Sequence, residues 1–211
     1  MQNIAGIYDL LASMVFGSHL QKAQTAYLHH VTPQSSLLII GGGSGWILKE
    51  ILKRSSPSSI FYLETSAAML ELARKEWGKI DKKVRGKTAI RFVYGSEEDI
   101  PAESKFDAVL TFFLLDCYTT PEAGLLMKKL KNHLRAEGLW LFADFRIDMN
   151  SFNRFWQKLF INIMYLFFGL SCGLKNRSLP DLQQLFSDHA LQMTENSYFF
   201  SGFIQSSIYH C

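Results

Sequence analysis

The sequence predicts an α/β fold, in which short apolar strands alternate with helices in a mostly parallel sheet. Four apolar residues, 37–40, lead directly into a glycine cluster at residues 41–45, and a short apolar run that ends at glycine is typical of a buried parallel strand. Residues 46–54 then repeat apolar positions at helical spacing, with charged residues between them. Further largely apolar runs follow at residues 60–63, 92–94 and 108–115. The pattern therefore predicts strand, turn and helix units in series.

The glycine cluster predicts a turn that a ligand can approach closely, because glycine lacks Cβ and tolerates positive φ. A Walker phosphate loop is excluded, since no Gly-Lys-Ser/Thr follows. A dinucleotide fingerprint fits Gly41 and Gly43, but Trp46 stands where its third glycine belongs. The spacing present is Gly41-x-Gly43-x-Gly45, with Gly42 inside it. From this stretch alone, a glycine turn that binds no ligand remains an alternative interpretation.

That spacing resembles motif I of class I S-adenosylmethionine-dependent methyltransferases, and the likeness continues downstream. Glu64 ends the second strand about twenty residues further on, where a carboxylate that accepts hydrogen bonds from ribose hydroxyls is expected. The run Glu64-x-Ser66-x-x-Met69-Leu70 resembles the segment after motif I in methyltransferases of the ubiquinone/menaquinone-biosynthesis type, the methyltransferase type 11/12 domain. By this resemblance the cofactor-binding residues of the first two strands are Gly41, Gly42, Gly43, Gly45, Glu64, Thr65, Ser66 and Met69.

Two later stretches resemble the same family. Residues 91–101 resemble its adenine-binding loop, which implies that Ser96 and Glu97 present backbone groups to the ring and that Asp99 accepts from the exocyclic amine. The plain alternative is a solvated acidic loop in which one of the three acids touches the cofactor. Residues 105–117 and 134–145 resemble the fourth and fifth strands, and Leu114 is expected beside the cofactor.

The resemblance implies a Rossmann-like, seven-stranded, mostly parallel sheet with helices on both faces and a C-terminal antiparallel hairpin at residues 191–200 and 203–210. Residues 1–211 are expected to form one domain. Residues 1–36 would be an N-terminal helical cap, and residues 145–180 an aromatic helical insert or lid. The implied function is transfer of the S-adenosylmethionine methyl group to a small acceptor by in-line displacement, with S-adenosylhomocysteine as product.

One position departs from the family. An acid usually stands two residues before the first glycine, where it helps to fix the glycine turn and the amino-acid end of the cofactor, and here that residue is Ile39. This departure motivates an alternative, a protein that binds S-adenosylmethionine or a nucleotide without transferring a methyl group. A further alternative is an NAD(P)-dependent oxidoreductase, against which Trp46 and the run from Glu64 to Leu70 argue.

Polar residues at the ends of the fourth and fifth strands are candidates for the acceptor site, because ligands bind at the carboxyl ends of strands in open α/β sheets. Asp116 is the candidate catalytic base and substrate-binding acid, Tyr118 would line the pocket, and Asp144 is the second acid. Each of them could instead solvate a strand end.

The regions outside the motifs give less specific predictions. Tyr8 is predicted near the methionine end of the cofactor or packed in the core, and a helix is expected over residues 19–29. Trp156 and Phe160 belong to a helical aromatic stripe. The stripe predicts a core or homodimer-interface helix, or else a wall for a lipophilic acceptor or a surface that touches a membrane. The uncharged run at residues 159–174 is shorter than the roughly twenty residues that span a bilayer.

Composition excludes several classes. A chain of 211 residues with 48% hydrophobic and 19% charged residues can bury a core and is not disordered. A net charge of +3 gives no case for a nucleic-acid partner. Three widely spaced cysteines and isolated histidines suggest neither disulfides nor a metal site. The cysteine pattern makes a reducing cytoplasm the expected location. No signal peptide is expected, because residues 1–12 lack its basic region.

Overall fold

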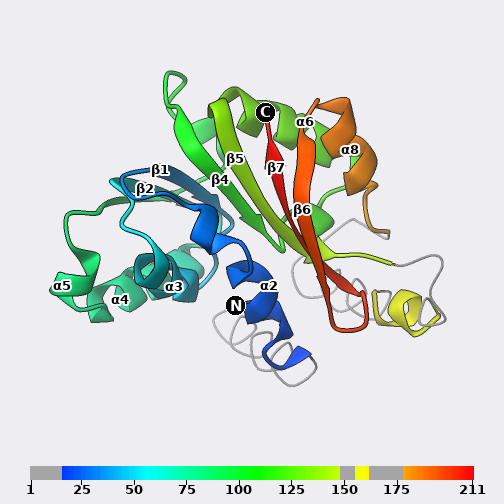
Figure 1. The fold of residues 1–211 in the computed structure, drawn as a ribbon, viewed down its shortest axis with the longest axis horizontal. Coiled ribbons are helices and arrows are strands. Elements are labelled where there is room, and N and C mark those ends of the chain that lie inside the picture. The colour runs from blue at the N-terminus through cyan, green and yellow to red at the C-terminus, as the bar shows by residue number, and fades with distance from the viewer. Residues whose placement is uncertain (1–15, 148–154, 162–177) are drawn as a thin grey trace.

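The computed structural model describes residues 16–147, 155–161 and 178–211, and these residues contain a seven-stranded sheet with helices on both faces (Figure 1). The strand order is β3-β2-β1-β4-β5-β7-β6. All neighbours are parallel from β3 to β5, whereas β7 is antiparallel to both β5 and β6. The strands are β1 Ser36–Ile40, β2 Ser59–Glu64, β3 Ala89–Tyr94, β4 Phe106–Phe112, β5 Leu134–Phe145, β6 Gln192–Phe199 and β7 Ile204–His210.

The central strand β1 is apolar on both sides because both faces of the sheet are covered. Leu38 and Ile40 pack on one face, while Leu37 and Ile39 pack on the other. Side chains alternate in this way along every strand, so the register of β1 against β2 determines which residues meet beside the glycine turn. In that register Ile39 lies opposite Tyr62.

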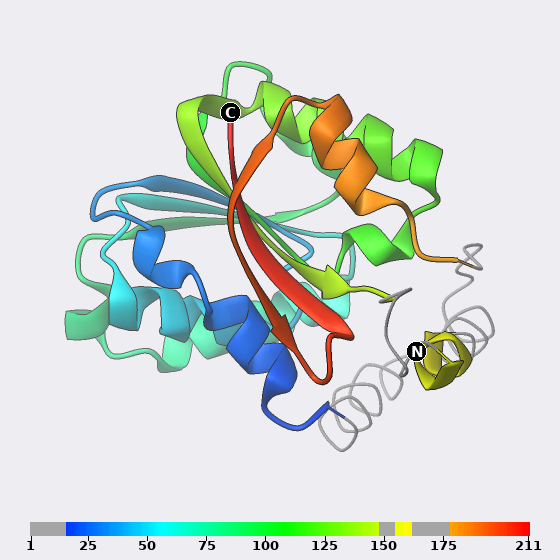
Figure 2. The ribbon, with the colours of Figure 1, turned by 45° about the vertical axis from the view of Figure 1, so that its right-hand side comes forward.

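The helices form two layers, which the rotated view separates (Figure 2). The face of Leu37 and Ile39 is covered by α2 His19–Thr25, α3 Trp46–Arg54 and α4 Ala67–Lys79, and the short α5 Lys82–Arg85 follows α4. The face of Leu38 and Ile40 is covered by α6 Thr120–Asn132 and α8 Leu182–Asp188. Three short 3₁₀ helices complete the description: η1 Leu28–His30, η2 Glu97–Asp99 and η3 Leu115–Cys117.

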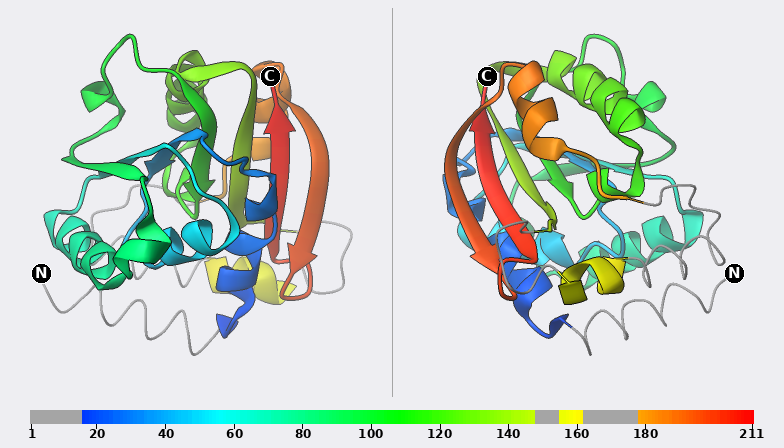
Figure 3. Two further views of the ribbon diagram at one scale, coloured as in Figure 1. Left: turned by 60° about the vertical axis from the view of Figure 1, so that its left-hand side comes forward. Right: turned by 90° about the vertical axis from the view of Figure 1, so that its right-hand side faces the viewer.

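The sheet confirms the predicted fold class, including the C-terminal hairpin. Strands β6 and β7 lie side by side at one end of the sheet (Figure 3). The later strand, β7, lies inside the sheet against β5, and the earlier strand, β6, forms the edge. Most of β6 is exposed, whereas β7 is almost wholly buried.

The helix predicted over residues 19–29 is wrong in its second half. The α-helix ends at Thr25, and a 3₁₀ turn follows at residues 28–30. Tertiary contacts accompany this break: Leu28 is fully buried, and the Tyr27 hydroxyl lies 2.8 Å from the Ser197 hydroxyl on β6. Within the described ranges, no helix is long and apolar enough to cross a membrane.

Candidate cofactor and acceptor site

The predicted site residues of the described chain gather at the carboxyl edge of the parallel strands. The glycine turn follows β1, Glu64 ends β2, the Gly95 turn follows β3, η3 follows β4, and Asp144 lies near the end of β5. This is the edge where open α/β sheets bind ligands. Tyr8 lies outside the described residues.

The glycine turn uses conformations that other residues rarely adopt. Gly41, Gly43 and Gly45 have φ values of 66°, 61° and 82°, in the left-handed region where glycine carries no steric cost. Gly45 also lies under α4, since a Cβ there would stand 2.7 Å from Cα of Ala73. A Cβ on Gly43 would meet nothing within 4 Å. The turn therefore presents open space beside its backbone, as a ligand lying against it requires.

Glu64 joins the glycine turn to the next helix. Its Oε2 accepts from the Gly43 amide at 2.9 Å, and its Oε1 accepts from the Ser66 amide at 2.8 Å. The Ser66 hydroxyl in turn caps α4 by accepting from the Met69 amide. A carboxylate has about four acceptor positions, so Glu64 retains about two for ribose hydroxyls. Glu64, Ser66 and the glycine turn therefore fit the adenosine part of S-adenosylmethionine. Thr65 is exposed beside them.

The turn after β3 lies against Glu64, because the Gly95 amide donates a hydrogen bond to the Glu64 carbonyl at 3.1 Å. Ser96 and Asp99 form a capping box around η2, in which Asp99 Oδ2 accepts from the Ser96 amide at 2.9 Å. That hydrogen bond uses one acceptor position of Asp99, the carboxylate that the sequence predicts to accept from the adenine amine. The contact of Asp99 with adenine stays a prediction. Glu97 pairs with Lys129 of α6 at 3.0 Å, which ties this turn to the helix layer.

The end of β4 closes the opposite side of the glycine turn. A Cβ on Gly41 would stand 2.7 Å from a Leu114 side-chain carbon, so Leu114 packs directly against the turn. Phe113 before it has a φ of 53°, a strained value for a bulky residue. Its amide donates to the Ala143 carbonyl at 2.7 Å, which holds the chain in that shape.

Asp116 and Asp144 form a buried carboxyl pair behind this turn. Asp144 Oδ2 accepts from the amides of Leu115 and Asp116, each at 3.1 Å, and Oδ1 accepts from the Phe145 amide at 2.8 Å. Burial raises the pKa of Asp116 to about 6, while its hydrogen bonds to Asp144 and Cys117 oppose that rise. Burial and the charge of Asp116 raise the pKa of Asp144. The two carboxyls therefore hold a shared proton near neutral pH.

Tyr118 is half-buried and lies near the acids of the site. Burial raises the pKa of its hydroxyl, and the charge of Glu97 raises it further. The phenol is therefore protonated across the neutral range and can donate a hydrogen bond.

Trp156 and Phe160 lie in an aromatic cluster next to these strand ends. The Trp156 ring lies 5.3 Å from that of Phe203, and the Phe160 ring 5.9 Å from it, between ring centroids. Phe203 contacts Phe145, and Phe145 contacts Phe113. The cluster therefore reaches the residues that follow Asp144 and precede Leu114. Its contact with an acceptor stays a prediction.

Tyr62, on β2, contacts the glycine turn, a role that the sequence analysis did not predict. Its hydroxyl donates to the Gly43 carbonyl at 2.9 Å, and the whole residue is buried. It stands two positions before Glu64 on β2 and therefore on the same face of the strand. That spacing was the available signal.

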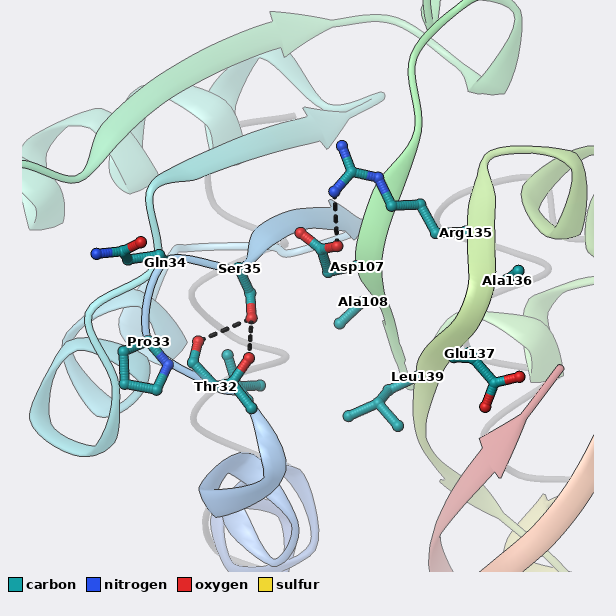
Figure 4. Close-up of a pocket in the computed structure, with 11 residues that line it drawn as sticks. Thr32, Pro33, Gln34, Ser35, Asp107, Ala108, Arg135, Ala136, Glu137 and Leu139 are labelled. Carbon is teal, nitrogen blue, oxygen red and sulfur yellow. Dashed lines mark hydrogen bonds and ion pairs between the residues drawn. The ribbon is translucent and has the colours of Figure 1, made fainter.

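A hollow lies at the opposite edge of the sheet and contains none of the predicted site residues (Figure 4). It has a volume of about 580 Å³ and is lined by the segment before β1 and by the starts of β4 and β5. Asp107 and Arg135 form an ion pair of 2.8 Å within it. Across the described part of the chain, no group of three or more His, Cys, Asp or Glu residues could hold a metal ion.

Comparison with known proteins agrees with this arrangement. A family model described as a methyltransferase domain matches residues 37–138. A malonyl-[acyl-carrier protein] O-methyltransferase of Halalkalibacterium halodurans is 26% identical over 117 residues, which cover 54% of this chain and 40% of that protein. The chain thus spans well under two thirds of the length of this relative.

Solved methyltransferase structures share the fold. The mitomycin 7-O-methyltransferase has a TM-score of 0.69 and 16% identity, with coverage of 100% of this chain and 59% of that one. The 1,6-didemethyltoxoflavin-N1-methyltransferase of Burkholderia thailandensis, solved with S-adenosylhomocysteine bound, has a TM-score of 0.63 and 12% identity, with coverage of 97% and 86%. The glycine turn and Glu64 lie within the matched segment, and residues 37–138 of this chain are therefore similar to the methyltransferase domain of class I, S-adenosylmethionine-dependent enzymes.

Proposed function

We propose that this protein transfers the methyl group of S-adenosylmethionine to a small lipophilic acceptor. The observation that carries the proposal is the position of Glu64, which fixes Gly43 and Ser66 and retains acceptor capacity toward the open side of the glycine turn.

The chemistry follows from what each part of the chain can do. The cofactor, when bound, supplies a methyl group already activated by a positively charged sulfur. Glu64 and the glycine turn would hold its adenosine part, and the turn after β3 would hold its adenine ring. The remaining role of the protein is to align the acceptor with the methyl group and to exclude water, and both effects accelerate the transfer.

Asp116 is the proposed base for an acceptor that carries a proton. With a pKa raised to about 6, it is largely ionised at neutral pH and yet a stronger base than an exposed aspartate. It lies at the end of β4, where an acceptor facing the methyl group would lie. The relatives' names include both oxygen and nitrogen acceptors, so they favour neither atom.

The lipophilic character of the acceptor is supported by the aromatic cluster around Trp156, Phe160 and Phe203 beside the same strand ends. Residues 155–161, which include Trp156 and Phe160, are helical, and within them Phe155 and Leu159, one helical turn apart, are 83% and 61% exposed. We propose that this exposed pair touches a membrane surface from which such an acceptor is taken. We also propose a cytoplasmic location, where exposed thiols such as Cys117 remain reduced.

Calorimetric titration with S-adenosylmethionine and S-adenosylhomocysteine tests the cofactor. We expect micromolar binding by the wild type and at least tenfold weaker binding by Glu64→Gln, because one carboxylate oxygen becomes an amide donor that faces the Gly43 or Ser66 amide. Glu50→Gln is the matched control, since Glu50 pairs with Lys53 and Arg54 on the surface of α3, and it should bind like the wild type. Absence of binding by the folded wild type would overturn the proposal.

The alternative, cofactor binding without transfer, is favoured by one observation. Ile39 is 1% exposed and packed in the core, so no carboxylate stands at that place in the turn. The two functions separate in an assay for S-adenosylhomocysteine release with a panel of lipophilic phenols, amines and carboxylic acids. Tight cofactor binding with no product from any class would favour the binding protein.

A further inference from the structure

The glycine turn is fixed at one residue, Gly43, through both of its backbone polar groups. The Gly43 amide donates to Glu64 Oε2 at 2.9 Å, and the Gly43 carbonyl accepts from the Tyr62 hydroxyl at 2.9 Å. Gly43 is also one of the residues with positive φ. Both partners lie on the same face of β2, so a single strand holds the two peptide groups on either side of the Gly43 Cα.

The Tyr62 ring fills the space beneath the turn. A Cβ on Gly42 would stand 2.4 Å from Cζ and 2.5 Å from the hydroxyl oxygen of Tyr62. The ring also packs against Phe92, with 5.3 Å between centroids. The hydroxyl is therefore held in place by packing on both sides, which keeps the entropic cost of its hydrogen bond low.

Tyr62 stands next to the position where the family usually has an acid. Ile39 and Tyr62 are direct partners in the parallel ladder of β1 and β2, and both belong to the same buried cluster. Ile39 carries no polar atom in its side chain, so it cannot hold the turn. At the position of β2 that pairs with Ile39, the polar group that reaches the turn is the Tyr62 hydroxyl.

We propose that Tyr62 is a positioning residue that replaces the missing acid at position 39, by holding the Gly43 carbonyl in its cofactor-binding orientation from the neighbouring strand. This inference rests on the proposed function, because it assigns Tyr62 a role in cofactor affinity. The bond is of the opposite polarity to that of an acid: a tyrosine donates to a carbonyl, whereas a carboxylate accepts from amides. Glu64 already accepts from the Gly43 amide, so the carbonyl is the group left to hold.

The first test is the affinity for S-adenosylhomocysteine of Tyr62→Phe, which removes one oxygen and keeps the ring. We expect about tenfold weaker binding, as loss of one buried hydrogen bond at the turn implies. Tyr209→Phe is the matched control, because Tyr209 is also buried but lies on β7 against Phe186. It should bind within twofold of the wild type at a temperature where all variants are folded.

The second test adds the acid. Ile39→Asp in the Tyr62→Phe background should recover most of the lost affinity, whereas Ile39→Asp alone should raise the wild-type affinity by no more than twofold. A merely structural role of Tyr62 would not produce this rescue. Hydrogen exchange of the ligand-free protein should show faster exchange at residues 41–45 in Tyr62→Phe than in Tyr209→Phe.

The outcomes separate the two claims. Wild-type binding with an unchanged Tyr62→Phe affinity would overturn the role of Tyr62 and leave the proposed function standing. A tenfold gain from Ile39→Asp alone would also overturn it, because the turn would then lack a substitute for the acid. No binding by the wild type would overturn the proposed function and, with it, the role in affinity.

Discussion

The carboxylate of Asp144 accepts a hydrogen bond from the backbone amide of Asp116, at 3.1 Å, across 28 residues of sequence. The bond fastens η3 to the end of β5 and places the Asp116 side chain beside a second buried acid. Asp116 and Asp144, which are close in space, therefore have different roles. Asp144 serves the backbone, and Asp116 is the one proposed to meet the acceptor.

The first prediction concerns stability as a function of pH. Because the folded pKa of Asp116 is raised to about 6 from the ordinary 3.8, the folded state binds the extra proton, and stability falls as pH rises from about 4 to about 6. Asp116→Asn lacks this penalty. Its free energy of unfolding relative to the wild type should therefore increase by about 2 kcal/mol between pH 4.5 and 7.5 in urea titrations. A difference that is independent of pH would contradict the raised pKa.

The second prediction contrasts the two acids. In Asp144→Asn one oxygen becomes an amide donor that faces either the Phe145 amide or the amides of Leu115 and Asp116. A buried clash of donors should lower the free energy of unfolding by about 2–3 kcal/mol. Asp116→Asn serves as the control at pH 7.5 and should be clearly more stable. Equal stability of the two variants would count against the anchoring role of Asp144.

The third prediction concerns the packing under the glycine turn. Gly42→Ala places a methyl group 2.4 Å from Cζ of Tyr62, so we expect a loss of about 1–3 kcal/mol in the free energy of unfolding, together with weaker S-adenosylhomocysteine binding. Gly78→Ala is the control, because Gly78 lies in α4 and a Cβ there meets nothing within 4 Å. Helix propensity should make that variant slightly more stable. The idea fails if thermal unfolding ranks the two variants the other way.

The fourth prediction concerns the aromatic cluster. Trp156→Ala or Phe160→Ala should raise the KM for a lipophilic acceptor at least fivefold and leave S-adenosylmethionine affinity within twofold of the wild type. The reason is that both rings pack on Phe203 and not on the glycine turn. A parallel loss of cofactor binding would mean that the cluster supports the whole site and does not select the acceptor.

The fifth prediction concerns the exposed pair on the same helix. Phe155→Ser with Leu159→Ser should reduce co-sedimentation with anionic phospholipid vesicles and leave cofactor affinity unchanged, because both side chains face solvent. The same substitutions on Leu125 and Leu72, exposed on α6 and α4, provide the control. If the wild type does not bind vesicles but forms a dimer that the double variant disrupts, the pair is an interface between two copies.

Local patterns were sufficient to predict the turn and its acid. The glycine spacing and Glu64 could be predicted because both follow directly from a strand end and its spacing in the sequence. The Asp116–Asp144 pair could not, since it depends on how the end of β5 meets η3 across 28 residues. The spacing of Tyr62 and Glu64 indicated a shared face of β2, but the hydrogen bond from Tyr62 to the turn was missed because it depends on the register of β2 against β1.

The position of β7 has a consequence for how the chain folds. This strand follows β5 and β6 in the chain but lies between them in the sheet. Until residues 204–210 are available, the edge of β5 has no partner, and β6 has nothing to pair with. An unpaired edge is a template for association with other chains. Synthesis and refolding should therefore pass through an aggregation-prone stage that ends only when β7 inserts, and a chain shortened before residue 204 should remain at that stage.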